Sequence, residues 1–326
     1  MLAPWLELPG LAERLRSYAD VVGQDLAAHG TTSDATTIRD TAVAQPLLVA
    51  SALLTFHAVF DGDQVDGDQV DGDRGADAHP ATAVGAVAGH SVGELGAAAI
   101  AGVLTEVQAL DLVTVRGAAM ARAAAVTPTG MSALLGGDPD EVLARLAELG
   151  LTAANVNGGG QVVAAGTLDA LAALTEAPPT RARVIPLQVA GAFHTTHMAP
   201  AVAELAARAV VVDPADPRIA LLLNADGAVV TSGSEVLARL VAQVANPVRW
   251  DLCQQTMQGL GVTGLLELAP GGVLTGLARR TLPGVETVAV KSPADLDAAR
   301  DLIRRHGGAH AAPTALTPPD IQENPS

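Results

Sequence analysis

Residues 82–93 read Thr-Ala-Val-Gly-Ala-Val-Ala-Gly-His-Ser-Val-Gly, a run of small apolar residues that ends in a Gly-x-Ser-x-Gly turn. The apolar part, 82–88, is typical of a buried strand, and the Ala- and Leu-rich stretch 92–102 predicts a helix. Between a strand and a helix, such a turn projects the serine Oγ outward, and the glycines at 89 and 93 leave room where side chains would collide. The stretch predicts Ser91 as a nucleophile; the alternative is a Gly-rich turn with an idle serine.

Outward from this turn, the apolar patterns predict helices over about 6–28, 42–60 and 106–125. Between 126 and 189, strand and helix patterns follow the order β-α-β-β-α-β, which is typical of a ferredoxin-like unit. Helices and strands alternate again up to 306. We therefore predict an α/β protein with a large discontinuous domain, 1–125 and 190–306, and an inserted ferredoxin-like small domain, 126–189.

Two segments have the composition of loops and not of folded elements. The sequence Asp-Gly-Asp-Gln-Val occurs at 61–65 and again at 66–70. A calcium loop of the EF-hand type needs a Glu at its twelfth position, and position 72 is Gly. We therefore predict a disordered acidic loop over 61–82, and a disordered tail rich in Pro and Ala over 307–326.

The composition restricts the partners and the compartment. The 326 residues include 19 Lys and Arg against 35 Asp and Glu, which gives a net charge of −16. A surface of this sign repels nucleic acid and anionic lipid, so neither is expected as a partner. The single cysteine excludes an internal disulfide and a Cys-rich metal site. No basic region precedes an apolar stretch at the N-terminus, and no apolar run is expected to reach membrane-spanning length, so we predict a cytoplasmic protein.

A nucleophilic serine needs a base, and histidine is the usual one. His194, in Gly-Ala-Phe-His-Thr at 191–195, and His197 both precede a predicted helix after the small domain. A loop that returns to the large domain there could carry the base, and spacing alone leaves the two open. His90 adjoins Ser91 at the tight point of the turn, where we expect it to pack.

Several motifs carry a resemblance to a known family. They are Gly-His-Ser-Val-Gly-Glu at 89–94, Val-Arg-Gly at 115–117, Asn-Val-Asn at 155–157, Gly-Gln-Val-Val-Ala-Ala-Gly at 160–166, Ala-Phe-His at 192–194, Asn-Pro-Val-Arg-Trp at 246–250, Glu-Leu-Ala-Pro-Gly at 267–271 and Val-Leu-Thr-Gly at 273–276. In this order they resemble the malonyl-CoA:acyl carrier protein transacylases, over about residues 40 to 282. The resemblance implies an α/β-hydrolase-like large domain, with the active site in the cleft beside the small domain.

The resemblance also implies roles for individual residues. Ser91 takes the malonyl group as an ester, His194 is the general base, and the backbone carbonyl of Gln243 orients its imidazole. On spacing alone Arg116 is an ordinary exposed helix residue, but by the resemblance it pairs with the free carboxylate of malonate. The Val92 N–H is an expected oxyanion donor.

Two further residues are expected to contact substrate. In related polyketide acyltransferase domains, Ala-Phe-His accompanies malonyl selectivity and Ala-Ser-His accompanies methylmalonyl, so Phe193 is expected to fill the space of an α-methyl group. A methyl group is worth only about 1–3 kcal/mol of discrimination, so a preference is expected. Asn157, in the Asn-Val-Asn motif, is also expected in the substrate site.

The implied reaction moves malonyl from malonyl-CoA to the phosphopantetheine thiol of acyl carrier protein for type II fatty acid synthesis. It needs no metal or cofactor, and a monomer is expected. The alternatives are a discrete malonyl acyltransferase of a polyketide pathway, a serine hydrolase, or a catalytically impaired relative.

The chain departs from the family at its start. The family begins with a strand and Pro-Gly-Gln-Gly-x-Gln, whose first Gln is one of two oxyanion donors, and this motif is absent here. Without that strand, unpaired sheet edges are expected. Two explanations stay open: a start codon assigned too far downstream, or a shortened protein with weak or no activity.

Overall fold

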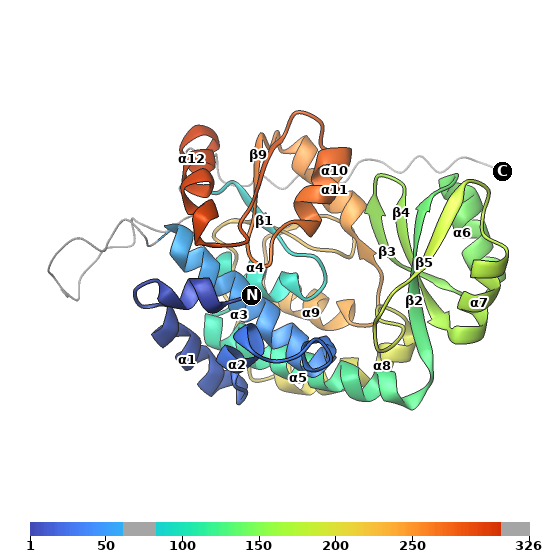
Figure 1. Cartoon of the computed structure of the whole chain (residues 1–326), viewed down its shortest axis with the longest axis horizontal. Helices are drawn as coiled ribbons and strands as arrows, with labels where there is room; N and C mark the ends of the chain where they lie inside the picture. Colours follow the sequence, from blue (N-terminus) through green and yellow to red (C-terminus); the bar gives the residue numbers. More distant parts are fainter. Residues whose placement is uncertain (61–82, 308–326) are drawn as a thin grey trace, which may run out of the picture.

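The computed structural model describes residues 1–60 and 83–307, in which helices and short strands alternate along the chain. A larger part with many helices lies beside a smaller part built on one sheet (Figure 1). The architecture is α/β, as predicted. The expected acidic loop 61–82 and, apart from Gly307, the expected tail lie outside the described residues.

The single helix expected over 6–28 is divided into three. A 3-10 helix η1 (Ala3–Glu7) precedes helices α1 (Leu11–Val22) and α2 (Leu26–Thr31). Gly10 and Gly23 at the ends of α1 have φ of 75° and 69°, a left-handed conformation that glycine adopts at little cost and that ends helices. The prediction was wrong because the apolar spacing continues across these breaks.

Helix α3 (Thr41–Phe60), preceded by η2 (Thr37–Arg39), contains Pro46 in its second turn. Because Pro46 has no N–H, it leaves the carbonyl of Ala42 free, and Gln24 Nε2 donates to that carbonyl at 3.1 Å. By length and composition α3 could cross a membrane, so the expectation that no apolar run reaches that length was wrong. Of its most apolar window 61% is buried inside the protein, as in the core helix of a globular domain.

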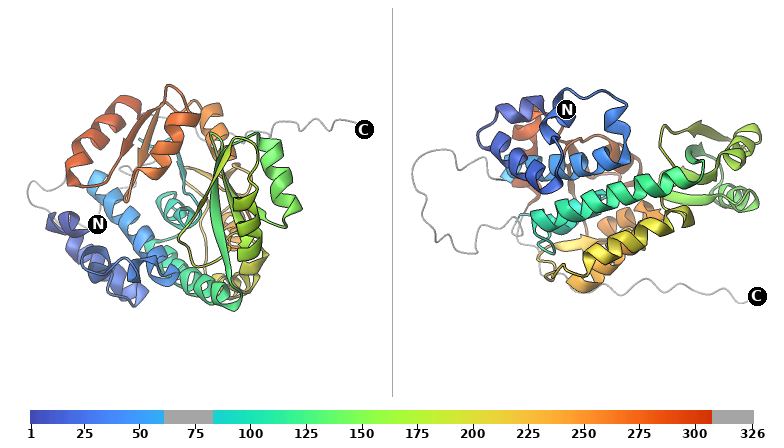
Figure 2. Two further views of the ribbon diagram at one scale, coloured as in Figure 1. Left: turned by 45° about the vertical axis from the view of Figure 1, so that its right-hand side comes forward. Right: turned by 90° about the horizontal axis from the view of Figure 1, so that it is seen from below.

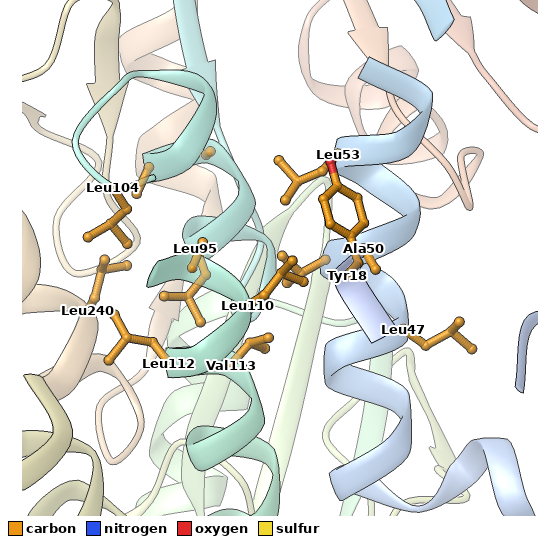
Figure 3. Packing of buried hydrophobic residues seen from close by; sticks show 14 of the residues in the cluster. Tyr18, Leu47, Ala50, Leu53, Leu95, Leu104, Leu110, Leu112, Val113 and Leu240 are labelled. Atoms are coloured by element: carbon orange, nitrogen blue, oxygen red, sulfur yellow. The ribbon is translucent and has the colours of Figure 1, made fainter. Parts of the chain in front are cut away.

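Helices α3, α4 (Gly93–Ile100) and α5 (Glu106–Val126) contribute many side chains to the main hydrophobic core. Figure 3 shows Leu53 of α3, Leu95 of α4 and Leu110 of α5 among its packed side chains. Thr105 begins α5 with a capping box to Gln108, which satisfies the first free amides of the helix. Helix α5 runs from this core to the small sheet (Figure 2), so its residues reach both parts of the protein.

The large part contains two separate parallel strand pairs. Strand β1 (Ala86–Ala88) pairs with β6 (Ala220–Leu222), to which β7 (Val229–Val230) adds antiparallel, and β9 (Gly264–Glu267) pairs with β10 (Glu286–Ala289). Among the described residues, β1, β7, β9 and β10 each have one edge without a strand partner. Residues 83–88 and 264–269 line one cavity of about 960 Å³.

The small sheet has the predicted ferredoxin-like order. Strands β2 (Thr129–Gly136), β3 (Thr152–Gly158), β4 (Gln161–Thr167) and β5 (Ala182–Pro186) lie in the spatial order β5-β2-β4-β3, with α6 (Pro139–Glu148) and α7 (Leu168–Glu176) between them in the chain. A strand that was not predicted, β8 (Val248–Arg249), joins the edge of the sheet parallel to β3. The sheet therefore includes residues far outside 126–189, although the division of the chain into domains stays a prediction.

The remaining helices follow the small sheet in the chain. They are η5 (Thr196–Met198), α8 (Ala199–Ala209), α9 (Gly233–Gln243), α10 (Trp250–Gly259), α11 (Val273–Thr281), η6 (Pro293–Asp295) and α12 (Leu296–His306). The apolar patterns predict helices over about 197–210 and 234–244, which α8 and α9 match to within two residues, and a helix after the Pro-Gly-Gly turn at 270–272, where α11 lies. Helices α10 and α12 and strands β7 and β10 were not predicted.

Candidate active site

Ser91 lies in a strained turn between β1 and α4, as its sequence pattern predicts. Its φ of 53° is in the left-handed region, which is uncommon for a residue with a side chain. A Cβ on Gly89 would lie 2.0 Å from the carbonyl carbon of Gly93, so only glycine fits at 89. A Cβ on Gly93 meets nothing within 4 Å, so the expectation that position 93 also needs glycine for space was wrong.

His194 is the histidine that contacts the serine. Its Nε2 lies 2.8 Å from Ser91 Oγ, although 103 residues separate the two in the chain. His197, the open alternative, lies in η5 and donates its N–H to Thr195. His90 packs at the turn, as expected: its ring lies 5.6 Å from that of Trp250, and its Nε2 is 2.9 Å from Asn157 Oδ1.

Two groups of Gln243 approach the other ring nitrogen of His194. The backbone carbonyl oxygen and the side-chain Nε2 both lie 3.2 Å from Nδ1. Only a proton on Nδ1 leaves Nε2 free to accept from the serine hydroxyl. In that tautomer Nδ1–H donates to the Gln243 carbonyl, which is the orienting contact expected from the resemblance.

Burial determines the charge of His194. The side chain is almost fully buried, and burial lowers the pKa of His194 from 6.5 to about 3, with a further lowering by the Arg116 charge. Desolvation disfavours the protonated ring, and a neighbouring cation repels it. The imidazole is therefore neutral near pH 7 and able to accept a proton.

Arg116 of α5 lies inside the site, so the alternative of an exposed helix residue was wrong. Its Nη2 donates to Ser91 Oγ at 3.2 Å and to Gln243 Oε1 at 3.1 Å, and its Nη1 donates to Gln45 Oε1 at 2.5 Å. Burial lowers the pKa of Arg116 to about 10, partly offset by Glu94, so the guanidinium stays charged near neutral pH. In the described part of the chain, no carboxylate lies within ion-pair distance of it.

The other predicted residues lie at different distances from this centre. Val92 caps α4, and among the described residues no acceptor bonds its N–H. Asn157 lines the cavity beside Ser91, but its side-chain oxygen contacts His90 and its Nδ2 donates to Gln161. Phe193 is half-buried against the main core and the cluster around Met131. The substrate roles of these three residues stay predictions.

Sequence reasoning missed two polar residues of the site. Gln45 of α3 holds Arg116, and buried Asn224 accepts the N–H of Ser91. Both come from segments whose patterns indicate only an apolar helix and a strand end, so no local signal marks them. Within residues 1–60 and 83–307 no cluster of three or more His, Cys, Asp or Glu side chains could hold a metal ion.

The 960 Å³ cavity between β1 and β9 extends to Ser91 and Val92. Its lining does not include Arg116, His194 or Gln243, although all three lie at the serine. The polar contacts, and not the cavity, therefore define the candidate site. A half-buried serine with a neutral histidine on one side and a charged arginine on the other has the groups that acyl transfer through a serine ester requires.

Comparisons with known proteins agree with this class. The model of a family described as "Acyl transferase domain" matches residues 81–316. Proteins named "Malonyl CoA-acyl carrier protein transacylase" are 49% identical in Mycobacterium tuberculosis, over 91% of this chain and 93% of theirs, and in Mycolicibacterium smegmatis, over 91% of this chain and 98% of theirs. A crystal structure of MCAT from Mycobacterium tuberculosis has a TM-score of 0.83 and 49% identity, covering 92% of this chain and 94% of that one.

The chain therefore belongs to the acyl transferase family, and within it to the malonyl CoA-acyl carrier protein transacylases.

Proposed function

We propose that this protein transfers the malonyl group from malonyl-CoA to the phosphopantetheine thiol of acyl carrier protein, as an acyl-carrier-protein S-malonyltransferase of type II fatty acid synthesis. The observation that carries the proposal is the position of Ser91 Oγ, 2.8 Å from His194 Nε2 and 3.2 Å from Arg116 Nη2. A nucleophile, its base and a carboxylate-binding cation thus converge on one atom.

In the first half-reaction His194 Nε2 takes the serine proton as Oγ attacks the thioester carbonyl. The carbonyl oxygen becomes an oxyanion, which the Val92 N–H at the start of α4 stabilises. The C–S bond then breaks, and the proton on His194 passes to the sulfur of coenzyme A. The products are free coenzyme A and a malonyl ester on Ser91.

The second half-reaction runs the same steps with the carrier thiol. The thiol gives its proton to His194, and its sulfur attacks the ester carbonyl. When the C–O bond breaks, His194 returns the proton to Ser91 Oγ. Malonyl ends on the carrier, and no oxidant, reductant or metal enters the balance.

Arg116 explains the choice of a dicarboxylic acyl group. In a malonyl ester on Ser91, a single methylene group separates the ester carbonyl from the free carboxylate. The guanidinium lies next to Oγ and is held by Gln45 and Gln243, so it can bind that carboxylate through two N–H groups. Its fixed orientation lowers the entropic cost of this contact.

A polyketide carrier is a second candidate partner. One similar structure, 29% identical with a TM-score of 0.79 over 92% of this chain, is titled as a type II PKS acyl-carrier protein in complex with its malonyl-transacylase. The chemistry is the same for either carrier, so only transfer rates to purified carriers separate the two. A monomer acting in the cytoplasm, without a cofactor, completes the proposal.

The test is the intact mass of the protein after incubation with malonyl-CoA. The wild-type chain gains one malonyl group, and Ser91→Ala gains none. Ser17→Ala, which removes an exposed hydroxyl on α1, is the matched control and keeps the adduct. Addition of phosphopantetheinylated carrier removes the adduct and charges the carrier. The proposal is contradicted if Ser91→Ala still gains the adduct. It is also contradicted if the wild type, in the presence of carrier, hydrolyses malonyl-CoA and does not charge the carrier.

A further inference from the structure

Asn224 makes three hydrogen bonds that span the Ser91 turn. It is fully buried and follows β6, 133 residues after the serine. Its Oδ1 accepts the N–H of Ser91 at 2.7 Å, and its Nδ2 donates to the carbonyl of Gly89 at 2.8 Å. Its backbone N–H donates to Glu94 Oε1 at 2.6 Å. Asn224 is therefore hydrogen-bonded to Gly89 before the nucleophile, to Ser91 itself and to Glu94 after it.

The turn needs such a partner because Ser91 has a φ of 53°. A residue with a side chain keeps this conformation only where its surroundings hold it. The turn presents one N–H, from Ser91, and one C=O, from Gly89, and a carboxamide supplies the matching acceptor and donor in a single rigid group. Because the Ser91 N–H is engaged in this way, it is not free to bind an oxyanion, whereas the Val92 N–H has no acceptor within residues 1–60 and 83–307.

We propose that Asn224 is a positioning residue for the Ser91 nucleophile: its carboxamide fixes the backbone of the turn and so aims Oγ between His194 and Arg116. Both of its carboxamide hydrogen bonds to the turn go to backbone atoms and not to Ser91 Oγ. The inference rests on the proposed function for the use of malonyl transfer as one readout. The position of Ser91 Oγ is also measured without malonyl, by the rate at which an alkyl fluorophosphonate modifies the serine.

Removal of the carboxamide frees the turn. In Asn224→Ala the Ser91 N–H and the Gly89 carbonyl lose their partner in a buried site, and φ of Ser91 can relax toward ordinary values. Oγ then leaves its position 2.8 Å from His194. A misplacement of about 1 Å costs on the order of 10²-fold in rate, and we expect a loss of about this size in kcat with KM for malonyl-CoA little changed.

Cys253→Ala is the matched control. Cys253 of α10 is fully buried, its Sγ lies 3.7 Å from Asn224 Nδ2, and it donates to the carbonyl of Leu223. Its truncation disturbs the same packing but leaves both bonds from Asn224 to the turn in place. A role in folding alone predicts that the two variants lose activity in proportion to their loss of thermal stability.

Asn224→Asp gives a second, pH-dependent readout. A protonated carboxyl there reproduces the carboxamide, because its C=O accepts from Ser91 and its O–H donates to Gly89. An ionised carboxylate instead sets two negative oxygens against the Gly89 carbonyl. In the described part of the chain, the titratable side chains that contact Asn224 are Glu94 of α4 and Cys253 of α10. The activity of Asn224→Asp relative to wild type is therefore expected to rise as the pH falls from 8 to 6.

Two rates are measured below the melting temperature of each variant: phosphonylation of Ser91 by an alkyl fluorophosphonate, followed by intact mass, and malonylation by malonyl-CoA. Both rates fall about 10²-fold in Asn224→Ala, stay near wild type in Cys253→Ala, and recover at low pH in Asn224→Asp. Wild-type rates in Asn224→Ala, equal losses in Cys253→Ala, or a flat pH ratio overturn the inference. If the wild type is phosphonylated but never malonylated, the proposed function fails while the role of Asn224 is still decided.

Discussion

Arg116 Nη2 donates to Ser91 Oγ at 3.2 Å, so a buried cation contacts the atom that His194 is placed to deprotonate. The same positive charge contributes to the lowered pKa of His194. A bound malonyl carboxylate offsets the positive charge of Arg116. Substrate binding is therefore expected to raise the pKa of His194, so that it is a stronger base when Ser91 attacks the thioester.

Arg116→Ala is expected to lower kcat/KM for malonyl-CoA by about 10- to 100-fold, because a hydrogen-bonded contact to a charged group is worth about 1.5–3 kcal/mol. The rate with acetyl-CoA, which has no free carboxylate, stays equal or improves. Arg116→Lys keeps the charge but not the paired N–H groups, and is expected to recover only part of the loss. Steady-state rates with the two thioesters measure this selectivity. Equal losses on both substrates would speak against the carboxylate contact.

The pH dependence of Ser91 reactivity follows from the pKa of His194. The neutral imidazole is the active form, and its pKa is lowered from 6.5 to about 3. The acid limb of the profile therefore lies well below pH 6.5, and reactivity toward a fluorophosphonate stays constant between pH 8 and 6. Because Arg116 contributes to the lowering, Arg116→Ala moves the acid limb upward.

The control for this profile is His194→Ala, which is expected to show a low rate without an acid limb. A wild-type limb near pH 6.5 that Arg116→Ala does not move would disprove the electrostatic coupling between the two side chains.

The local sequence was sufficient to predict Ser91 as the nucleophile, because the strand, the Gly-x-Ser-x-Gly turn and the helix that present it follow one another directly in the chain. The β-α-β-β-α-β order of the small sheet was predictable for the same reason, since each element has its own apolar period. His194 and Arg116 are different. They meet Ser91 only through folding, and they were identified from a resemblance of motifs while spacing left them open.

Gln45 and Asn224 could not be predicted because their importance lies in their partners. In the sequence, Gln45 is a polar residue in an apolar helix, and only the fold brings Arg116 to it. In the same way, Asn224 is a residue at a strand end, and only the fold places it against the Ser91 turn. The two-residue strands β7 and β8 likewise exist only through pairing with neighbours. Helix α12 does have a sequence signal, because its apolar residues Leu296, Ala299 and Leu302 recur at helical spacing and form its buried face.

Phe193→Ser is expected to weaken the preference for malonyl-CoA over methylmalonyl-CoA by about 10-fold, since one methyl group is worth about 1–3 kcal/mol. Phe193 directly precedes His194 and is half-buried, so a smaller side chain leaves space at this end of the site. Competition between the two thioesters, read as the masses of the two acyl-enzymes, measures the change. If the ratio of the two acyl-enzymes is unchanged in a folded Phe193→Ser, Phe193 does not occupy the space of the α-methyl group.

Glu94→Gln is expected to change how stability depends on pH. Burial raises the pKa of Glu94 from 4.5 to about 8, although Asn224 and Arg116 oppose the shift. The unfolded carboxyl ionises above about 4.5, while the folded one keeps its proton until about 8. The contribution to stability is thus fully present below pH 4.5 and is lost as the pH rises toward 8, by at most about 1.4 kcal/mol per pH unit.

Glutamine keeps an oxygen for the Asn224 N–H but has no proton to lose. The free energy of unfolding of Glu94→Gln, from urea titrations, is therefore expected to fall less than that of wild type between pH 5 and 8. Glu286→Gln is the control, because Arg305 lowers the pKa of Glu286 to about 2 and its exposed carboxylate stays ionised throughout this range. Parallel curves for wild type and Glu94→Gln would show that Glu94 is already ionised in the folded protein.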